Sequence, residues 1–258
     1  MINSISKQNS LFESRVLVWY SDGAASAVAA KKAIEKYGDT HLVEVIKCDT
    51  YKNEHSDNRR FTIEIQDWLG QEIKVLSSEK YSDIYEVFAA TKMLKKGRFA
   101  PCTAELKKKV RWQYQEPNDI HVFGYTIEEK DRLDGLMLEN FDLTIDWILA
   151  DENITKEDCF RTLQDAGIKL PMMYRLGCKN NNCIGCVKGK AGYWNKIRVD
   201  FPEVFDRMAR EERERNFALC TLTVKGETKP VFLDELPPDA GNYKTDFEFD
   251  CGVLCQTS

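Results

Sequence analysis

Apolar and polar residues follow one another along this chain in a strand–helix rhythm. The apolar run 16–20 ends in a polar turn, and an alanine-rich stretch at 24–37 follows, which is rich in strong helix formers. Four later apolar runs are typical of buried strands: 42–50, 72–76, 119–125 and 143–149. Helical patterns separate and follow them: 57–70, 83–94, 100–114, 128–140 and 155–166. The alternation predicts an α/β fold with a doubly wound, mostly parallel sheet.

The pattern changes after Pro171. Residues 174–190 are rich in Gly, Asn, Cys and Lys, and a charged amphipathic helix is expected at 193–215. Residues 220–233 suggest a small hairpin. We therefore expect an α/β domain at 15–170 and a helical, cysteine-rich C-terminal region at 171–258, packed on that domain.

Composition and charge narrow the classes of protein. The 258 residues are 43% hydrophobic and 31% charged, with a formal net charge of -5. A soluble globular protein is expected, and the acidic balance argues against a grip on nucleic acid over the whole surface. The chain has no apolar run of membrane-spanning length and begins without a signal-type apolar core, so a cytoplasmic location and no membrane partner are expected. The oligomeric state stays open.

The turn after the first apolar run is a candidate anion site. Ser21, Asp22, Gly23, Ala24 and Ser26 would lie between a strand and a helix, where backbone N–H groups and two hydroxyls face the same guest. Phosphate is the usual anion at such a helix N-terminus, and glycine lets it approach closely. The competing interpretation is an ordinary β–α turn with a serine cap.

Two further groups carry candidate chemistry. Asp49 and Thr50 follow the second strand, where a parallel sheet places its ligand crevice. Cys102 lies near an expected helix N-terminus that would favour its thiolate, and Lys107 and Lys108 could neutralise a phosphate or sulfuryl group. The alternative is a half-buried cysteine beside a solvated basic helix face.

The cysteines are clustered rather than scattered. Cys183 and Cys186 form a C-x-x-C, and Cys251 and Cys255 form a C-x-x-x-C near the end of the chain, with Cys178 as a spare ligand. Two chelating pairs can close one tetrahedral site. Four thiolates suit zinc or an iron–sulfur cluster, and the spacing does not choose between them. A pair of redox dithiols is the other interpretation.

In this order the motifs resemble the PP-loop adenine-nucleotide α-hydrolase superfamily and, within it, the phosphoadenosine-phosphosulfate (PAPS) reductase family. The matching stretches are 21–26 for the phosphate loop, 49–50 for an Asp-Thr, 102–107 for C-T-x-x-x-K, 183–186 for the cluster cysteines and 250–254 for the reductases' C-terminal E-C-G motif. The stretch 181–189 resembles a subfamily of bacterial and phage genomes. The resemblance implies a Rossmann-like fold, an adenine nucleotide (PAPS, APS or ATP, with or without Mg²⁺) and a 4Fe–4S cluster, with zinc as the alternative.

Departures from the family pattern bear on the chemistry. Asp22 stands where the ATP-using members carry Gly, and Ala25 where they carry Asp, so ATP cleavage is the less favoured reaction. Cys255 replaces the reductases' His, and only Cys102 remains of their adjacent cysteine pair. Cys251 is therefore either the nucleophile or a metal ligand, and Cys102 is the fallback nucleophile.

Three functions are consistent with these residues. The leading one is sulfonucleotide reduction by a thiolate, with Lys107 offsetting charge and a thioredoxin-like partner releasing sulfite. The second is an ATP-dependent sulfurtransferase that adenylates a nucleobase, which would bring in a nucleic acid partner. The third is a non-catalytic nucleotide-binding module with a structural zinc.

Overall fold

The chain forms two compact units. The computed structural model describes residues 14–224, 226–242 and 246. The last passage between the units falls at Pro171, next to the boundary expected from the sequence. Unit 2 also takes in two earlier segments of the chain. Unit 1 consists of the described residues up to Asp49, Asp57–Leu76 and Arg111–Pro171; unit 2 consists of Thr50–Ser56, Ser77–Val110 and the described residues from Met172 onward.

A five-stranded parallel sheet organises unit 1 and confirms the predicted α/β class. Its strand order is β3-β2-β1-β4-β5. The chain runs outward from β1 to β3 and then returns to the other side of β1, so the direction switches between β1 and β4. The strands are β1 (Arg15–Tyr20), β2 (Leu42–Cys48), β3 (Ile73–Leu76), β4 (Ile120–Phe123) and β5 (Thr144–Asp146).

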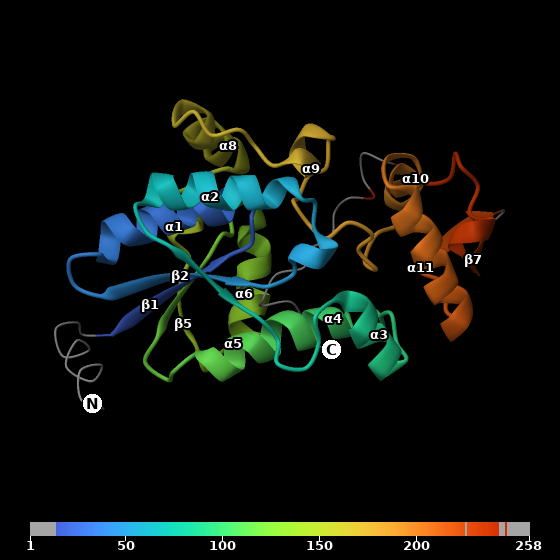
Figure 1. Cartoon of the computed structure of the whole chain (residues 1–258), viewed down its shortest axis with the longest axis horizontal. Coiled ribbons are helices and arrows are strands. Elements are labelled where there is room, and N and C mark those ends of the chain that lie inside the picture. Colours follow the sequence, from blue (N-terminus) through green and yellow to red (C-terminus); the bar gives the residue numbers. More distant parts are fainter. Residues whose placement is uncertain (1–13, 225, 243–245, 247–258) are drawn as a thin grey trace. The chain divides into compact units, whose positions relative to one another are not determined.

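Helices cover both faces of this sheet. Figure 1 shows α1 and α2 on one face and α5 on the other. Helix α1 buries Ala24, Ala27, Ala30 and Ala33, whose spacing of three keeps small side chains toward the sheet and allows close packing. The helices of unit 1 are α1 (Ala24–Tyr37), α2 (Asp57–Leu69), α5 (Lys109–Tyr114, which starts in unit 2), α6 (Lys130–Glu139), α7 (Ile148–Asp151) and α8 (Lys156–Asp165).

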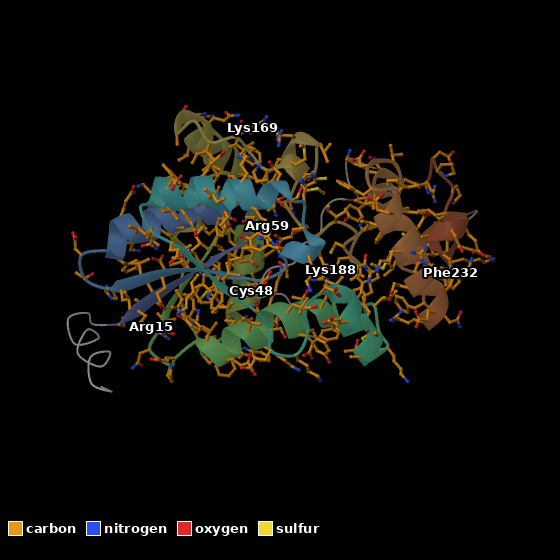
Figure 2. The ribbon with its side chains drawn as sticks, viewed as in Figure 1. Arg15, Cys48, Arg59, Lys169, Lys188 and Phe232 are labelled. Atoms are coloured by element: carbon orange, nitrogen blue, oxygen red, sulfur yellow. The ribbon has the colours of Figure 1, made fainter. Side chains whose placement is uncertain are left out.

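Polar contacts join the two strands that flank the switch. At the amino ends, the Arg15 guanidinium donates to both carboxylate oxygens of Asp119, at 2.9 and 2.7 Å. Trp19 Nε1 donates to His121 Nδ1 at 3.0 Å inside the sheet. Burial lowers the pKa of His121 to about 4, so this imidazole is neutral at pH 7. Arg15 and Cys48 mark the start of β1 and the end of β2 in Figure 2.

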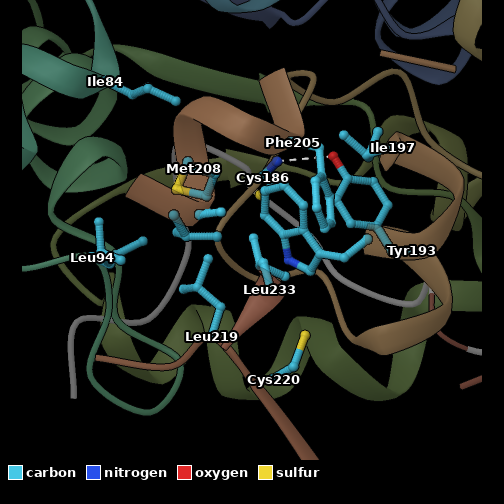
Figure 3. Close-up of a cluster of buried hydrophobic side chains, with 14 of the residues drawn as sticks. Ile84, Leu94, Cys186, Tyr193, Ile197, Phe205, Met208, Leu219, Cys220 and Leu233 are labelled. Atoms are coloured by element: carbon cyan, nitrogen blue, oxygen red, sulfur yellow. Dashed lines mark hydrogen bonds between the residues drawn. The ribbon is translucent and has the colours of Figure 1, made fainter. Parts of the chain in front are cut away.

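Unit 2 is built around a hydrophobic core in which Trp194 is fully buried and Tyr193 and Phe205 nearly so (Figure 3). The hairpin predicted near the C-terminus is present, with its turn at Gly226 in the left-handed region (φ 85°). The elements of unit 2 are the 3₁₀ turn Tyr51–Asn53, α3 (Ile84–Thr91), α4 (Pro101–Thr103), the π-helical turn Ala104–Lys108, α9 (Met172–Arg175), α10 (Ala191–Asp200), α11 (Pro202–Arg215), β6 (Cys220–Val224), β7 (Glu227–Val231) and the 3₁₀ turn Leu233–Glu235.

Two element predictions were wrong. The strand expected at 143–149 ends at Asp146, because only three residues of β5 pair with β4 and the chain then turns into α7. The single helix expected at 193–215 is two helices that meet at Phe201 and Pro202. Proline disfavours the helical conformation of the residue before it, and Phe201 is extended in φ (-143°).

None of the helices in the described part of the chain combines the length and apolar character needed to cross a bilayer.

A buried carboxylate joins three elements of unit 2. The Glu212 side chain in α11 is fully buried and accepts from the backbone N–H of Leu219 at 2.5 Å and of Leu233 at 2.6 Å. Burial is the largest cause of its shifted pKa, which is raised from 4.5 to about 7.

The pKa of Glu212 predicts a pH-dependent stability. Between pH 4.5 and 7 the folded protein holds this proton more tightly than the unfolded chain, so the free energy of unfolding falls as pH rises through that window. The expected loss from this group is about 3 kcal/mol. Urea unfolding at pH 5 and pH 8 measures it. Glu212→Gln should flatten the dependence, whereas Glu203→Gln, an exposed control on the same helix, should not; equal slopes for both variants would contradict the assignment.

Candidate functional site

The loop between β1 and α1 has the form expected of an anion site. Gly23 is the cap residue of α1, with extended backbone angles (φ -92°, ψ 152°). Glycine has no side chain to accept from the first N–H groups of the helix, and these groups carry the positive end of the helix dipole. The loop follows β1, so it lies at the carboxyl edge of the sheet beside the switch between β1 and β4.

The two serines of the loop have different roles. The Ser26 hydroxyl is buried and donates to the Gly23 carbonyl at 2.9 Å. It also accepts from Ser21, from the backbone N–H at 3.1 Å and from the hydroxyl at 3.3 Å. Ser26 therefore closes the loop on itself, while Ser21 is exposed and is the hydroxyl available at the surface of the loop.

Gly124 completes this corner of unit 1, and sequence reasoning missed it. A Cβ added at Gly124 would lie 2.5 Å from the Ser26 nitrogen, 2.6 Å from its Cα and 2.8 Å from the Ala25 carbonyl carbon. Residue 124 directly follows β4, so the ends of β1 and β4 meet at the N-terminus of α1. The signal in the sequence was a glycine at the end of the fourth apolar run.

Asp22 points into the protein. Its backbone is in the left-handed region (φ 55°), and the side chain is fully buried. One carboxylate oxygen lies 2.5 Å from Lys47 Nζ, and the other accepts from the Thr62 hydroxyl at 2.6 Å. Lys47 and Thr62 were not identified as site residues from the sequence. A lysine within the apolar second strand was the signal that could have indicated one of them.

Asp49 and Thr50 fall on either side of a unit boundary. Asp49, in unit 1, is partly exposed, and its backbone N–H donates to the Leu76 carbonyl at 2.8 Å. Because β1 and β2 are adjacent and parallel, with Tyr20 opposite Lys47, Asp49 and the 21–26 loop share one edge of the sheet. Thr50, in unit 2, is buried and donates its hydroxyl proton to Glu54 at 2.5 Å.

The basic candidates lie in one helical stretch of unit 2. Cys102 is partly exposed in the short helix α4, and Lys107 and Lys108 fall in the π-helical turn that follows it. Lys107 is half-buried and Lys108 is buried. Single π turns inside helices occur frequently at functional sites, since the wider turn redirects side chains.

Cys183 and Cys186 flank a tight turn of unit 2. Gly185 between them is left-handed (φ 74°), and neither thiol is in a disulfide within the described part of the chain. The Cys186 N–H donates to the Tyr193 hydroxyl at 2.8 Å, shown as a dashed line in Figure 3, and that hydroxyl donates to the Cys183 carbonyl at 3.3 Å. Burial raises the pKa of Tyr193 well above 10, so this phenol stays protonated and keeps both contacts.

The other half of the expected metal site is the second cysteine pair. Cys251 and Cys255 lie outside the described residues. Within residues 14–224, 226–242 and 246, no three His, Cys, Asp or Glu side chains are grouped so that they could bind a metal, so Cys178 does not complete a three-ligand set with Cys183 and Cys186 there.

Comparison with known proteins does not assign the chain. No family model matches it, and no curated protein matches it either.

The contact at Gly124 predicts a severe effect of one methyl group. Gly124→Ala should destabilise unit 1 by about 1–3 kcal/mol, because the new Cβ overlaps backbone atoms that cannot move without shifting the loop. Gly135→Ala is the matched control: it lies within α6 with open space around its Cβ, and should be neutral or stabilise by about 0.5–1 kcal/mol. Chemical unfolding of both variants measures the difference, and equal effects would refute the packing argument.

Proposed function

We propose that the protein is a PAPS-reductase-like enzyme that binds an adenine nucleotide and reduces a sulfonucleotide. The observation that carries the proposal is the loop 21–26, a glycine-capped helix N-terminus next to the strand switch of a five-stranded parallel sheet. Phosphates bind at such positions because backbone N–H groups and the helix dipole both favour an anion.

The conformation of Asp22 supports the resemblance to the PP-loop superfamily. ATP-using members carry glycine at this position, and a left-handed φ of 55° is one that glycine adopts at no steric cost. Aspartate tolerates this region better than most residues. The loop can therefore keep a PP-loop backbone even though its second residue is not glycine.

The proposed reaction needs a thiolate and a source of electrons. A thiolate attacks the sulfur of the sulfonucleotide. It is the thiolate of Cys251 if this residue does not bind the metal, and the thiolate of Cys102 if Cys251 is the fourth metal ligand. The S–O bond to the phosphate breaks, the nucleotide leaves, and a thiosulfonate remains on the cysteine. A thioredoxin-like dithiol then supplies two electrons, is oxidised to its disulfide and releases sulfite. Lys107 and Lys108 would offset the charge of the departing phosphate.

We assign a 4Fe–4S cluster to Cys183, Cys186, Cys251 and Cys255, with zinc as the alternative. The first pair fits either group, because two cysteines two residues apart flank a left-handed glycine in a turn held by Tyr193. A bound cluster would supply one-electron chemistry, and zinc would only cross-link the chain. The backbone of this turn fixes the spacing of Cys183 and Cys186, the first two proposed ligands.

The metal assignment predicts coloured protein. Anaerobic preparations should be brown and absorb near about 400 nm, and Cys183→Ser or Cys186→Ser should lose most of the iron. Cys159→Ala is the control, since this cysteine is buried in α8 of unit 1, where its pKa is raised to about 12 by burial. Colourless protein with stoichiometric zinc would instead favour a structural staple.

Sulfite release tests the reaction itself. The anaerobic protein, supplied with PAPS or APS and a thioredoxin-like dithiol, should release sulfite, and Cys251→Ser with its metal retained should lose at least about 100-fold of the rate if Cys251 is the nucleophile. Loss in Cys102→Ser instead would identify the fallback. Pyrophosphate or AMP from ATP, with no sulfite from either sulfonucleotide, would contradict the reductase and indicate the sulfurtransferase.

A further inference from the structure

We propose that Lys47 and Thr62 are positioning residues for the 21–26 loop: they hold the Asp22 carboxylate inside unit 1, so that the loop can accept a phosphate despite carrying an acid. The inference deepens the proposed nucleotide function and rests on it for the identity of the anion. Neither residue belongs to the loop; Lys47 lies in β2 and Thr62 in α2.

The first step is the cost of the conformation of Asp22. A left-handed, fully buried aspartate combines backbone strain with the loss of hydration of a charge. Such a residue persists only where its surroundings determine it strongly. Here the two carboxylate oxygens have separate partners, Lys47 Nζ at 2.5 Å and the Thr62 hydroxyl at 2.6 Å.

The second step is the position of Lys47. Lysine is almost never fully buried unless it is paired, yet Lys47 is 1% exposed in a strand whose neighbours Ile46 and Cys48 are apolar and buried. The apolar neighbours of Lys47 in the strand do not compensate its charge. The ammonium lies against Asp22, which directly precedes the cap residue Gly23, so the pair places no net charge beneath the N-terminus of α1.

The third step is the consequence for an anion. A carboxylate turned toward the crevice would repel phosphate, and the same carboxylate, left unpaired but ionised beneath the loop, would repel it through a poorly screening interior. Pairing with Lys47 cancels that repulsion, and the Thr62 hydroxyl fixes the rotation of the carboxylate. The left-handed turn at Asp22 then leads the backbone into the extended conformation of Gly23.

The test compares affinities for adenosine 3′,5′-bisphosphate and for adenosine, which lacks the phosphates. Lys47→Met should weaken bisphosphate binding about 10- to 100-fold and change adenosine binding less than about twofold. The reason is that the unpaired Asp22 carboxylate repels the charged phosphates and not the uncharged nucleoside. Thr62→Val, of similar size, should weaken bisphosphate binding about 3- to 10-fold through the lost hydrogen bond. Lys32→Met, which removes a half-exposed lysine of α1, is the control and should leave both affinities within about twofold.

A double variant keeps the test decisive if Lys47→Met folds poorly. Asp22→Gly with Lys47→Met removes both charges and supplies a residue that adopts the left-handed turn freely, so bisphosphate affinity should return to within about fivefold of the wild type. A folded Lys47→Met protein with wild-type bisphosphate affinity, or a double variant as weak as Lys47→Met, would overturn the inference. So would equal losses for adenosine and the bisphosphate, which would show a merely structural role.

Failure of the proposed function gives a different result. If the wild type binds neither adenosine 3′,5′-bisphosphate nor ATP, the nucleotide proposal falls, and with it the phosphate part of this inference. Hydrogen–deuterium exchange of residues 21–26 then still decides the positioning part: exchange should be faster in Lys47→Met and Thr62→Val than in the wild type and Lys32→Met. Unchanged exchange in both variants would overturn that part as well.

Discussion

The parallel pairing of β1 with β2 on one side and β4 on the other is the constraint on which the candidate site depends. In a parallel sheet the carboxyl ends of all strands share one edge, so the ends of β1, β2 and β4 converge there although they are far apart in sequence. The switch of direction between β1 and β4 leaves that edge unobstructed by a crossover. Gly124 then brings the end of β4 against the first turn of α1.

Charge placement within unit 1 follows from the same pairing. The register sets Tyr20, the last residue of β1, opposite Lys47. The lysine side chain therefore reaches Asp22, two residues beyond the end of β1. Asp22 meets Lys47 there, and both are buried. Such a pair contributes little net stability, because the cost of removing two charges from water offsets their attraction, but it specifies one arrangement of the loop.

Unit 2 uses aromatic packing to shape its cysteine turn. The Tyr193 ring fills the space over Gly189, where a Cβ would lie 2.0 Å from a ring carbon, and its hydroxyl bonds the backbone on both sides of Gly185. The conformation of the turn is therefore stabilised by protein contacts alone, through Tyr193, a core residue of α10. The thiols of Cys183 and Cys186 therefore lie on a turn whose backbone is bonded to Tyr193 at both cysteines.

The sequence by itself determined the alternation of strands and helices, the class of fold and the position of the 21–26 loop, because these follow from short-range periodicity and helix propensity. It failed where neighbours in space decide: Pro202 could have signalled the break between α10 and α11, but the length of β5 depends on how far β4 accompanies it. Periodicity does not predict the orientation of the Asp22 side chain, and a carboxylate in a phosphate loop repels the anion unless it points away or holds a cation. Only tertiary structure decided this, because the partners of Asp22 come from β2 and α2, and long-range ion pairs leave no periodic trace in a sequence.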